Sequence, residues 1–147
     1  MIRGLADALL PVARKRIKEV YEAVQNDKKS VYAPLFKENK SNEIQIIEVY
    51  ENYTTAFGMI VNQSGFQSAF AIYNEDKTNS EGSRSIVTRL LYEILSGLSG
   101  KIQEDNYPAC HDKIIEGEHN SDNYEDLFKE ASIALKRAIR TFEIVKK

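Results

Sequence analysis

Apolar residues recur at steps of three and four along the chain, and this spacing predicts amphipathic helices. The first such segment covers residues 5–26. Pro11 cannot donate a backbone hydrogen bond, so we expect it either in the first turn of this helix or at a kink. A linker with one packed turn is expected over residues 30–39, because Pro34 interrupts a short apolar run there.

The second periodic segment, residues 42–62, keeps its apolar positions in phase for five turns. A strand over residues 44–49 is the alternative, since this stretch is rich in β-branched residues. The persistence of the helical period favours the helix, and its wide apolar face predicts a place in the middle of the bundle. A turn at Gly65 and a short helix to Tyr73 follow.

Further helices are predicted over residues 86–98 and over residues 122–146, the latter capped by Ser121 or Asp122. Residues 74–83 contain no apolar side chain and are expected to form an exposed loop. The connection over residues 103–121 contains Pro108, with Ile114 and Ile115 anchoring a short piece of it. The pattern therefore predicts a single all-α domain, residues 1–147, built as a compact bundle of about five main helices.

Composition adds limits on function. With 42% hydrophobic residues, a chain of 147 residues suits one helical core. The formal net charge of −2 excludes a strong overall attraction to nucleic acid or anionic membranes, so binding to either needs a local patch. A single cysteine and the lack of a long apolar run favour a cytoplasmic protein with no membrane segment.

The sequence offers little for catalysis. Its only thiol or imidazole side chains are Cys110, His111 and His119, whose spacing matches no zinc motif. Adjacency of Cys110 and His111 does not favour a nucleophile–base pair, and no glycine-rich phosphate loop occurs. We therefore expect no cofactor, no metal and no enzymatic activity.

Basic residues are the more informative group, because they cluster in three of the predicted helices. If these helix faces converge, they form a strip that binds phosphates. The alternative is three ordinary solvated faces in a chain that is 29% charged. The residues concerned are Arg14, Lys15, Arg16, Lys18, Arg84, Arg89, Lys136, Arg137 and Arg140.

Three stretches resemble the small α-helical subunit of type III-B CRISPR (Cmr) RNA-targeting complexes. Residues 56–73 pair a helix that ends in Met59-Ile60-Val61 with a turn at Gly65-Phe66 and a short apolar helix. The run Leu90-Leu91-Tyr92-Glu93-Ile94-Leu95 is similar to the family's Leu-Tyr helix, and residues 131–145 are similar to its last helix.

This resemblance implies a non-catalytic structural subunit for antiviral defence, which stacks with copies of itself along the duplex of crRNA and target RNA. The other Cmr effector subunits would be its partners, and cleavage would belong to them. The basic residues would then contact the RNA backbone whatever the base sequence. Those implied in contact are Arg14, Lys15, Lys18, Arg84, Arg89, Lys136, Arg137 and Arg140.

Two other functions remain open from the residues alone. The acidic stretch over residues 104–126 suits a helical adaptor or toxin-immunity protein that masks a basic partner. A helical hydrolase is the third hypothesis, with His111 as its test residue.

Overall fold

The computed structural model describes residues 4–75, 83–97, 101–118 and 123–147. Within these ranges the chain forms six helices, a short helical turn and two three-residue strands. The expectation of a mainly α-helical fold is confirmed. The elements are α1 (Leu5–Asn26), η1 (Ala33–Leu35), β1 (Gln45–Ile47), α2 (Glu48–Ser64), α3 (Phe66–Tyr73), α4 (Ser85–Ser96), α5 (Tyr107–Ile115), α6 (Tyr124–Ile139) and β2 (Glu143–Val145).

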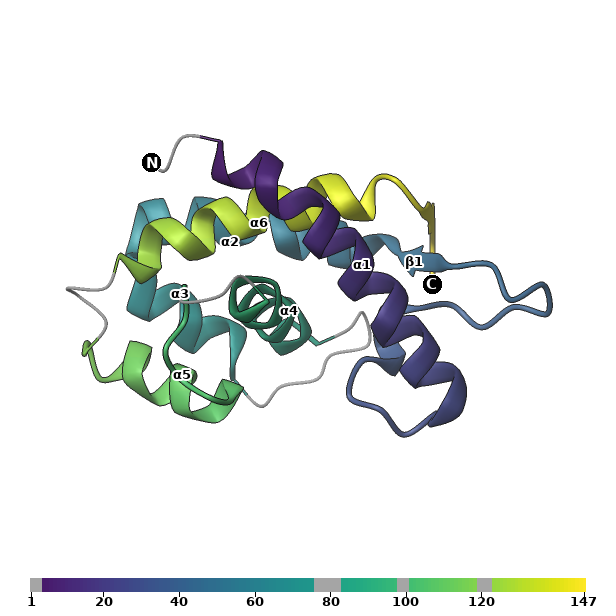
Figure 1. Cartoon of the computed structure of the whole chain (residues 1–147), viewed down its shortest axis with the longest axis horizontal. Coiled ribbons are helices and arrows are strands. Elements are labelled where there is room, and N and C mark those ends of the chain that lie inside the picture. Colours follow the sequence, from purple (N-terminus) through teal and green to yellow (C-terminus); the bar gives the residue numbers. More distant parts are fainter. Residues whose placement is uncertain (1–3, 76–82, 98–100, 119–122) are drawn as a thin grey trace.

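Helix α6 lies at the centre of the packing. It contacts α1, α2 and α4 extensively. In Figure 1, α2 and α6 lie along the upper side of the molecule and α1 runs diagonally from the top to the lower right. Helix α4 is seen end-on beneath α6, with α3 to its left and α5 lower on the same side. Ten of the sixteen residues of α6 are buried, against five of the seventeen in α2. The middle position expected for residues 42–62 therefore belongs to α6.

Strands β1 and β2 correct two predicted helix boundaries. They pair in parallel, with Ile46 opposite Ile144, and Phe36 forms a further bridge to Ile46. Helix α2 thus begins at Glu48 rather than at residue 42, and α6 ends at Ile139 rather than at residue 146. The strand alternative was right for residues 45–47, where the β-branched Ile46 and Ile47 lie in a ladder whose second strand comes from the far end of the chain.

Helix α5 is longer than the short anchored piece expected in the connection between α4 and α6. Asn106 caps it, since its Oδ1 accepts a hydrogen bond from the backbone N–H of Ala109 at 2.9 Å. Pro108 sits in the first turn, where no backbone donor is needed.

Two other local expectations have different outcomes. Pro11 lies inside α1, beyond its first turn, so the first of the two alternatives expected for it was wrong. Most of the predicted loop over residues 74–83 and the predicted caps Ser121 and Asp122 lie outside the described residues. Asn123, with a φ of 58°, directly precedes α6.

Candidate nucleic-acid interface

Basic side chains line the outer side of α6. Its buried residues, among them Leu127, Phe128, Ala131 and Leu135, occupy one face of the helix. Residues at positions 129, 133, 136, 137 and 140 fall on the opposite face, because a helix turns through about 100° per residue. We call this face the α6 ridge. It consists of Lys129, Ile133, Lys136, Arg137 and Arg140.

Helix α1 adds basic groups beside the end of the ridge. The Nε of Arg14 donates a hydrogen bond to Thr141 Oγ1 at 3.1 Å, and the guanidinium lies 4.8 Å from the centre of the Phe142 ring. Thr141 directly follows Arg140 of the ridge. Lys18 is exposed one helical turn after Arg14, and thus on the same flank of α1. The surface therefore continues from α6 onto α1.

Carboxylates flank the two arginines of the ridge. Arg137 Nη1 lies 3.1 Å from Asp7 Oδ1 of α1, and Arg140 Nε lies 2.8 Å from Glu51 Oε2 of α2. Asp7 is 84% exposed, and pairs of this kind contribute only about 0.2–1 kcal/mol because water and salt screen them. A phosphate can therefore replace Asp7 as the partner of Arg137 at small cost.

Lys15 and Arg16 turn away from the ridge, toward α4. Both line an open cavity of about 320 Å³ between the two helices, together with Glu19 and Glu93. Arg16 Nε donates to Glu93 Oε2 at 2.5 Å, while its Nη1 lies 3.4 Å from Glu19 Oε1. Acidic groups thus balance the basic ones in this cavity, and Lys15 does not extend the predicted phosphate-binding strip.

Arg84 and Arg89 lie on neither the α6 ridge nor the cavity between α1 and α4. The Arg84 guanidinium lies 5.5 Å from the ring centre of Tyr53 in α2 and 5.9 Å from that of Tyr73 in α3. The Arg89 guanidinium lies 4.6 Å from the ring centre of Tyr107 in α5. The nine basic residues therefore do not converge into one strip: five join α6 and one flank of α1, and four lie on other surfaces.

A comparison with protein families decides the kind of protein. The model of a family described as CRISPR-associated protein (Cas_Cmr5) matches residues 12–140. The chain belongs to this family. It is therefore a small subunit of a type III-B CRISPR (Cmr) complex, and the resemblance noted in the sequence is confirmed. The match runs from the second turn of α1 to Arg140 and so includes the whole α6 ridge.

No curated protein and no solved structure matches the chain significantly. Assignment of this Cmr subunit thus rests on the family match, and the roles of its residues rest on its own geometry. Among the described helices, none is both long enough and apolar enough to cross a membrane.

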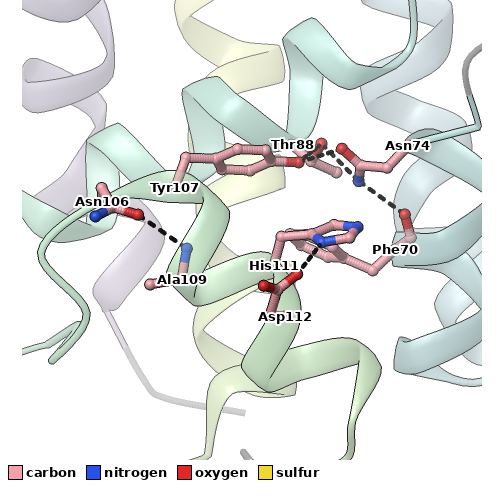
Figure 2. Close-up of polar contacts among 8 residues, drawn as sticks. All are labelled: Phe70, Asn74, Thr88, Asn106, Tyr107, Ala109, His111 and Asp112. Atoms are coloured by element: carbon pink, nitrogen blue, oxygen red, sulfur yellow. Dashed lines mark hydrogen bonds and ion pairs between the residues drawn. The ribbon is translucent and has the colours of Figure 1, made fainter.

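The residues considered for catalysis lie in and around α5 (Figure 2). Cys110 is buried, and burial raises the pKa of its thiol to about 12, with Glu104 adding to the increase. His111 Nδ1 lies 3.2 Å from Asp112 Oδ1 of the adjacent residue. Over the described ranges, no three His, Cys, Asp or Glu side chains meet as a metal ion would require. His119 lies outside those ranges.

The other polar contacts in Figure 2 hold α5 in place. Tyr107 donates its hydroxyl to Asn74 Oδ1 at 2.5 Å and lies 2.7 Å from Thr88 Oγ1. Asn74 Nδ2 in turn donates to the carbonyl of Phe70 at 2.8 Å, near the end of α3. This network joins α5 to α3 and α4, and we assign it a structural role.

Sequence reasoning missed Lys129 and Ile133 as members of the ridge. The signal was present, since both lie on the outer side of a helix whose inner side was already predicted. By contrast, no local pattern could show that Asp7 and Glu51 face the arginines, because they come from helices far away in the chain.

Proposed function

We propose that this Cmr subunit is a non-catalytic structural component, which stacks along the crRNA–target RNA duplex and contacts its backbone through the α6 ridge, Arg14 and Lys18. The observation that carries this proposal is the gathering of Lys136, Arg137 and Arg140 on the solvent side of one helix in a chain of the Cmr family. Antiviral defence in the cytoplasm is the setting that the proposal assumes.

The dimensions of the ridge suit a phosphate backbone. Lys129 and Arg140 are eleven positions apart in the sequence, which corresponds to about 16 Å along a helix axis. Several successive phosphates fit along this length. Contacts to phosphates position a protein without reading bases. Such contacts suit a complex in which the guide RNA reads the target by base pairing.

The proposal assigns RNA cleavage to other subunits. The chain's nucleophile candidate, Cys110, is buried with a raised pKa, so little thiolate is present near neutral pH. His111 has its neighbouring carboxylate as its hydrogen-bond partner. These features support a structural part for α5, with RNA contact made by α6.

Stacking of copies also has support on the surface. Met59 of α2 and Ile133 of α6 are among the exposed large apolar residues. Helices α2 and α6 approach each other at Gly58 and Ser132, where Ser132 Oγ would lie 3.9 Å from a Cβ added at Gly58. Met59 directly follows Gly58, and Ile133 directly follows Ser132. We propose that Met59 and Ile133 meet a second copy of the chain, so that Ile133 packs against protein while the basic side chains of the α6 ridge face the RNA.

The test is a double charge reversal, Arg137→Glu with Arg140→Glu, in the assembled complex. We expect weaker RNA association and a flatter dependence of log K on log salt, because fewer counterions are released. The matched control, Lys28→Glu with Lys29→Glu, changes the net charge equally at the end of α1. Equal losses in both doubles, or no loss in either, would count against RNA contact through α6. Circular dichroism checks that both doubles fold.

A further inference from the structure

The N-terminal end of α4 carries a set of hydrogen-bond donors. The first backbone N–H groups of a helix lack the usual partner one turn earlier and carry a partial positive charge. At α4 the N–H of Ile86 donates to the carbonyl of Ser83 at 3.3 Å and that of Val87 to the carbonyl of Arg84 at 3.0 Å, which leaves the N–H groups of Arg84 and Ser85 without a partner among the described residues. Within the described part of the chain no side chain caps α4, and the first turn of this helix contains no acidic residue. The hydroxyls of Ser83 and Ser85 lie here, 3.0 Å apart. This end of α4 therefore favours a negative charge that the first turn of the helix does not itself provide.

Arg84 places a full positive charge at the same end. Its side chain is exposed, and its guanidinium lies against the rings of Tyr53 and Tyr73. Among the described residues Arg84 forms no ion pair, whereas Arg16, Arg137 and Arg140 all do. The tyrosine rings thus hold a guanidinium whose hydrogen-bonding groups are available to an anion.

The second observation is a buried hydroxyl without a partner. Tyr53 is only 8% exposed, and within the described part of the chain its hydroxyl makes no hydrogen bond. The neighbouring hydroxyls are satisfied: Tyr73 donates to the carbonyl of Tyr53 at 2.5 Å, and Tyr50 accepts from the N–H of Ser83 at 2.9 Å. Since a buried donor is costly when its hydrogen bond is not made, the Tyr53 hydroxyl points to a missing acceptor.

The pKa values of Tyr50 and Tyr73 are both affected by Tyr53. Burial raises the pKa of Tyr73 to about 12, while Arg84 opposes the increase and Tyr53 adds to it. Burial also raises the pKa of Tyr50, and Tyr53 adds to that increase too. The geometry agrees: the Tyr53 ring lies 5.7 Å from that of Tyr50, and the hydroxyl of Tyr50 accepts from the backbone N–H of Ser83 at the start of α4.

We propose that the N-terminal end of α4 is a binding site for a phosphate group, separate from the α6 ridge. Arg84 supplies the charge, and the Ser83 and Ser85 hydroxyls, the end of α4 and the Tyr53 hydroxyl supply hydrogen bonds. Because Tyr53 is covered, Arg84 turns from the rings toward the anion as it binds. Helix N-termini with an arginine suit a tetrahedral oxyanion, which accepts from several directions at once.

The phosphate has two sources, a phosphodiester of RNA or a phosphate monoester. Only the RNA phosphodiester rests on the proposed function, and it would give this subunit a second contact with RNA besides the α6 ridge. The experiment is a titration of the ¹⁵N-labelled full chain followed by amide chemical shifts. The three ligands are inorganic phosphate, an oligoribonucleotide with a 5′-phosphate and the same oligoribonucleotide with a 5′-hydroxyl.

We expect inorganic phosphate to shift the amides of residues 83–87 in a saturable way. Arg84→Gln should weaken this binding about tenfold, as expected for loss of a charged hydrogen-bonding group. The control Lys29→Gln, at an exposed residue outside both surfaces, should leave it unchanged. Shifts spread over all basic side chains, or binding that Arg84→Gln leaves intact, would overturn the site without touching the ridge proposal. If only the 5′-hydroxyl oligoribonucleotide fails to shift these amides, the site takes a monoester; if both oligoribonucleotides shift them, it takes the RNA backbone.

Tyr53→Phe should have opposite effects on the stability of the free chain and on phosphate binding. Removal of an unpartnered buried hydroxyl should leave the free chain as stable as before, or more stable. The same change should weaken phosphate binding several-fold, because the acceptor for that hydroxyl is the ligand. Unchanged phosphate affinity in Tyr53→Phe would show that the hydroxyl is no part of a site and would overturn its role.

Discussion

Arg137 of α6 and Asp7 of α1 form an ion pair, with Nη1 and Oδ1 3.1 Å apart, across the boundary between the two helices. The Asp7 carboxylate is therefore paired with the same guanidinium that, in the proposed function, binds an RNA phosphate. We therefore predict that Asp7→Asn strengthens RNA association of the assembled complex, because Arg137 no longer exchanges one anion for another. RNA affinity measured at several salt concentrations checks this, with an expected gain of a few-fold and a steeper salt dependence.

The free energy of unfolding of Asp7→Asn shows whether the Asp7–Arg137 pair mainly stabilises the fold. Loss of an exposed ion pair should lower the free energy of unfolding by no more than about 1 kcal/mol. Asp27→Asn is a matched control, since it removes one negative charge at the far end of α1. A gain in RNA affinity of the same size in Asp27→Asn would mean that net charge, and not the Arg137 partner, is responsible.

The second prediction concerns the attachment of α5. Tyr107→Phe removes a hydroxyl that lies within hydrogen-bonding distance of both Asn74 and Thr88. Because it leaves polar groups of a largely buried network without a partner, we expect a loss of about 1–3 kcal/mol in the free energy of unfolding. Urea denaturation followed by circular dichroism measures it.

Tyr21→Phe provides the comparison for that loss. The Tyr21 ring is buried against Phe36, but its hydroxyl has no hydrogen-bond partner in the described part of the chain. We expect a change within about 0.5 kcal/mol. If the two variants are equally stable, the network around Tyr107 does not hold α5.

The third prediction is that Cys110 is inert in the folded chain. Burial raises the pKa of its thiol to about 12, and Glu104 adds to the increase. Relative to an exposed thiol, this lowers the thiolate fraction at pH 8 about a thousandfold. A disulfide reagent should therefore label the native chain only at the rate of unfolding, and label the denatured chain at once.

An exposed cysteine serves as the reference for labelling. Ser68→Cys places a thiol on the exposed side of α3, and one equivalent should react immediately in that variant. Rapid labelling of Cys110 in the native wild-type chain would reopen the catalytic hypothesis for α5.

Local pattern predicted the helices that bury a long apolar stripe. Residues 5–26 and the α6 segment are such cases, because the signal for each lies within one stretch of chain. It did not predict the β1–β2 ladder, in which Gln45 pairs with Glu143. Nor did it predict the full length of α5, whose buried residues are too few to set a period.

The same division applies to the candidate site. Spacing alone put Lys136, Arg137 and Arg140 on one helix. It could not show that Lys15 turns toward α4, or that Asp7 faces Arg137, because both depend on how distant helices cross. The contact of each basic residue with RNA stays a prediction.

The last prediction concerns pH and the Arg16–Glu93 pair. Burial raises the pKa of Glu93 despite the attraction of Arg16, since the Glu93 side chain is only 16% exposed. Burial acts to lower the pKa of Arg16, but the effect is limited because this side chain is 38% exposed. The attraction of Glu93 and Glu19 together therefore raises the pKa of Arg16. The pair is thus held together at a cost in desolvation of the carboxylate.

A carboxyl whose pKa is higher in the folded state binds protons more tightly there. Its contribution to stability is therefore complete below its unfolded pKa, near 4.5, and is lost as the pH rises through the folded pKa. Glu93→Gln keeps an oxygen acceptor for Arg16 and removes this titration. We expect the free energy of unfolding of Glu93→Gln, relative to wild type, to increase from pH 4 to pH 7. Urea denaturation at each pH measures the difference, with Glu22→Gln as an exposed control on α1. A difference that decreases with pH would mean that attraction to Arg16 outweighs the burial of Glu93.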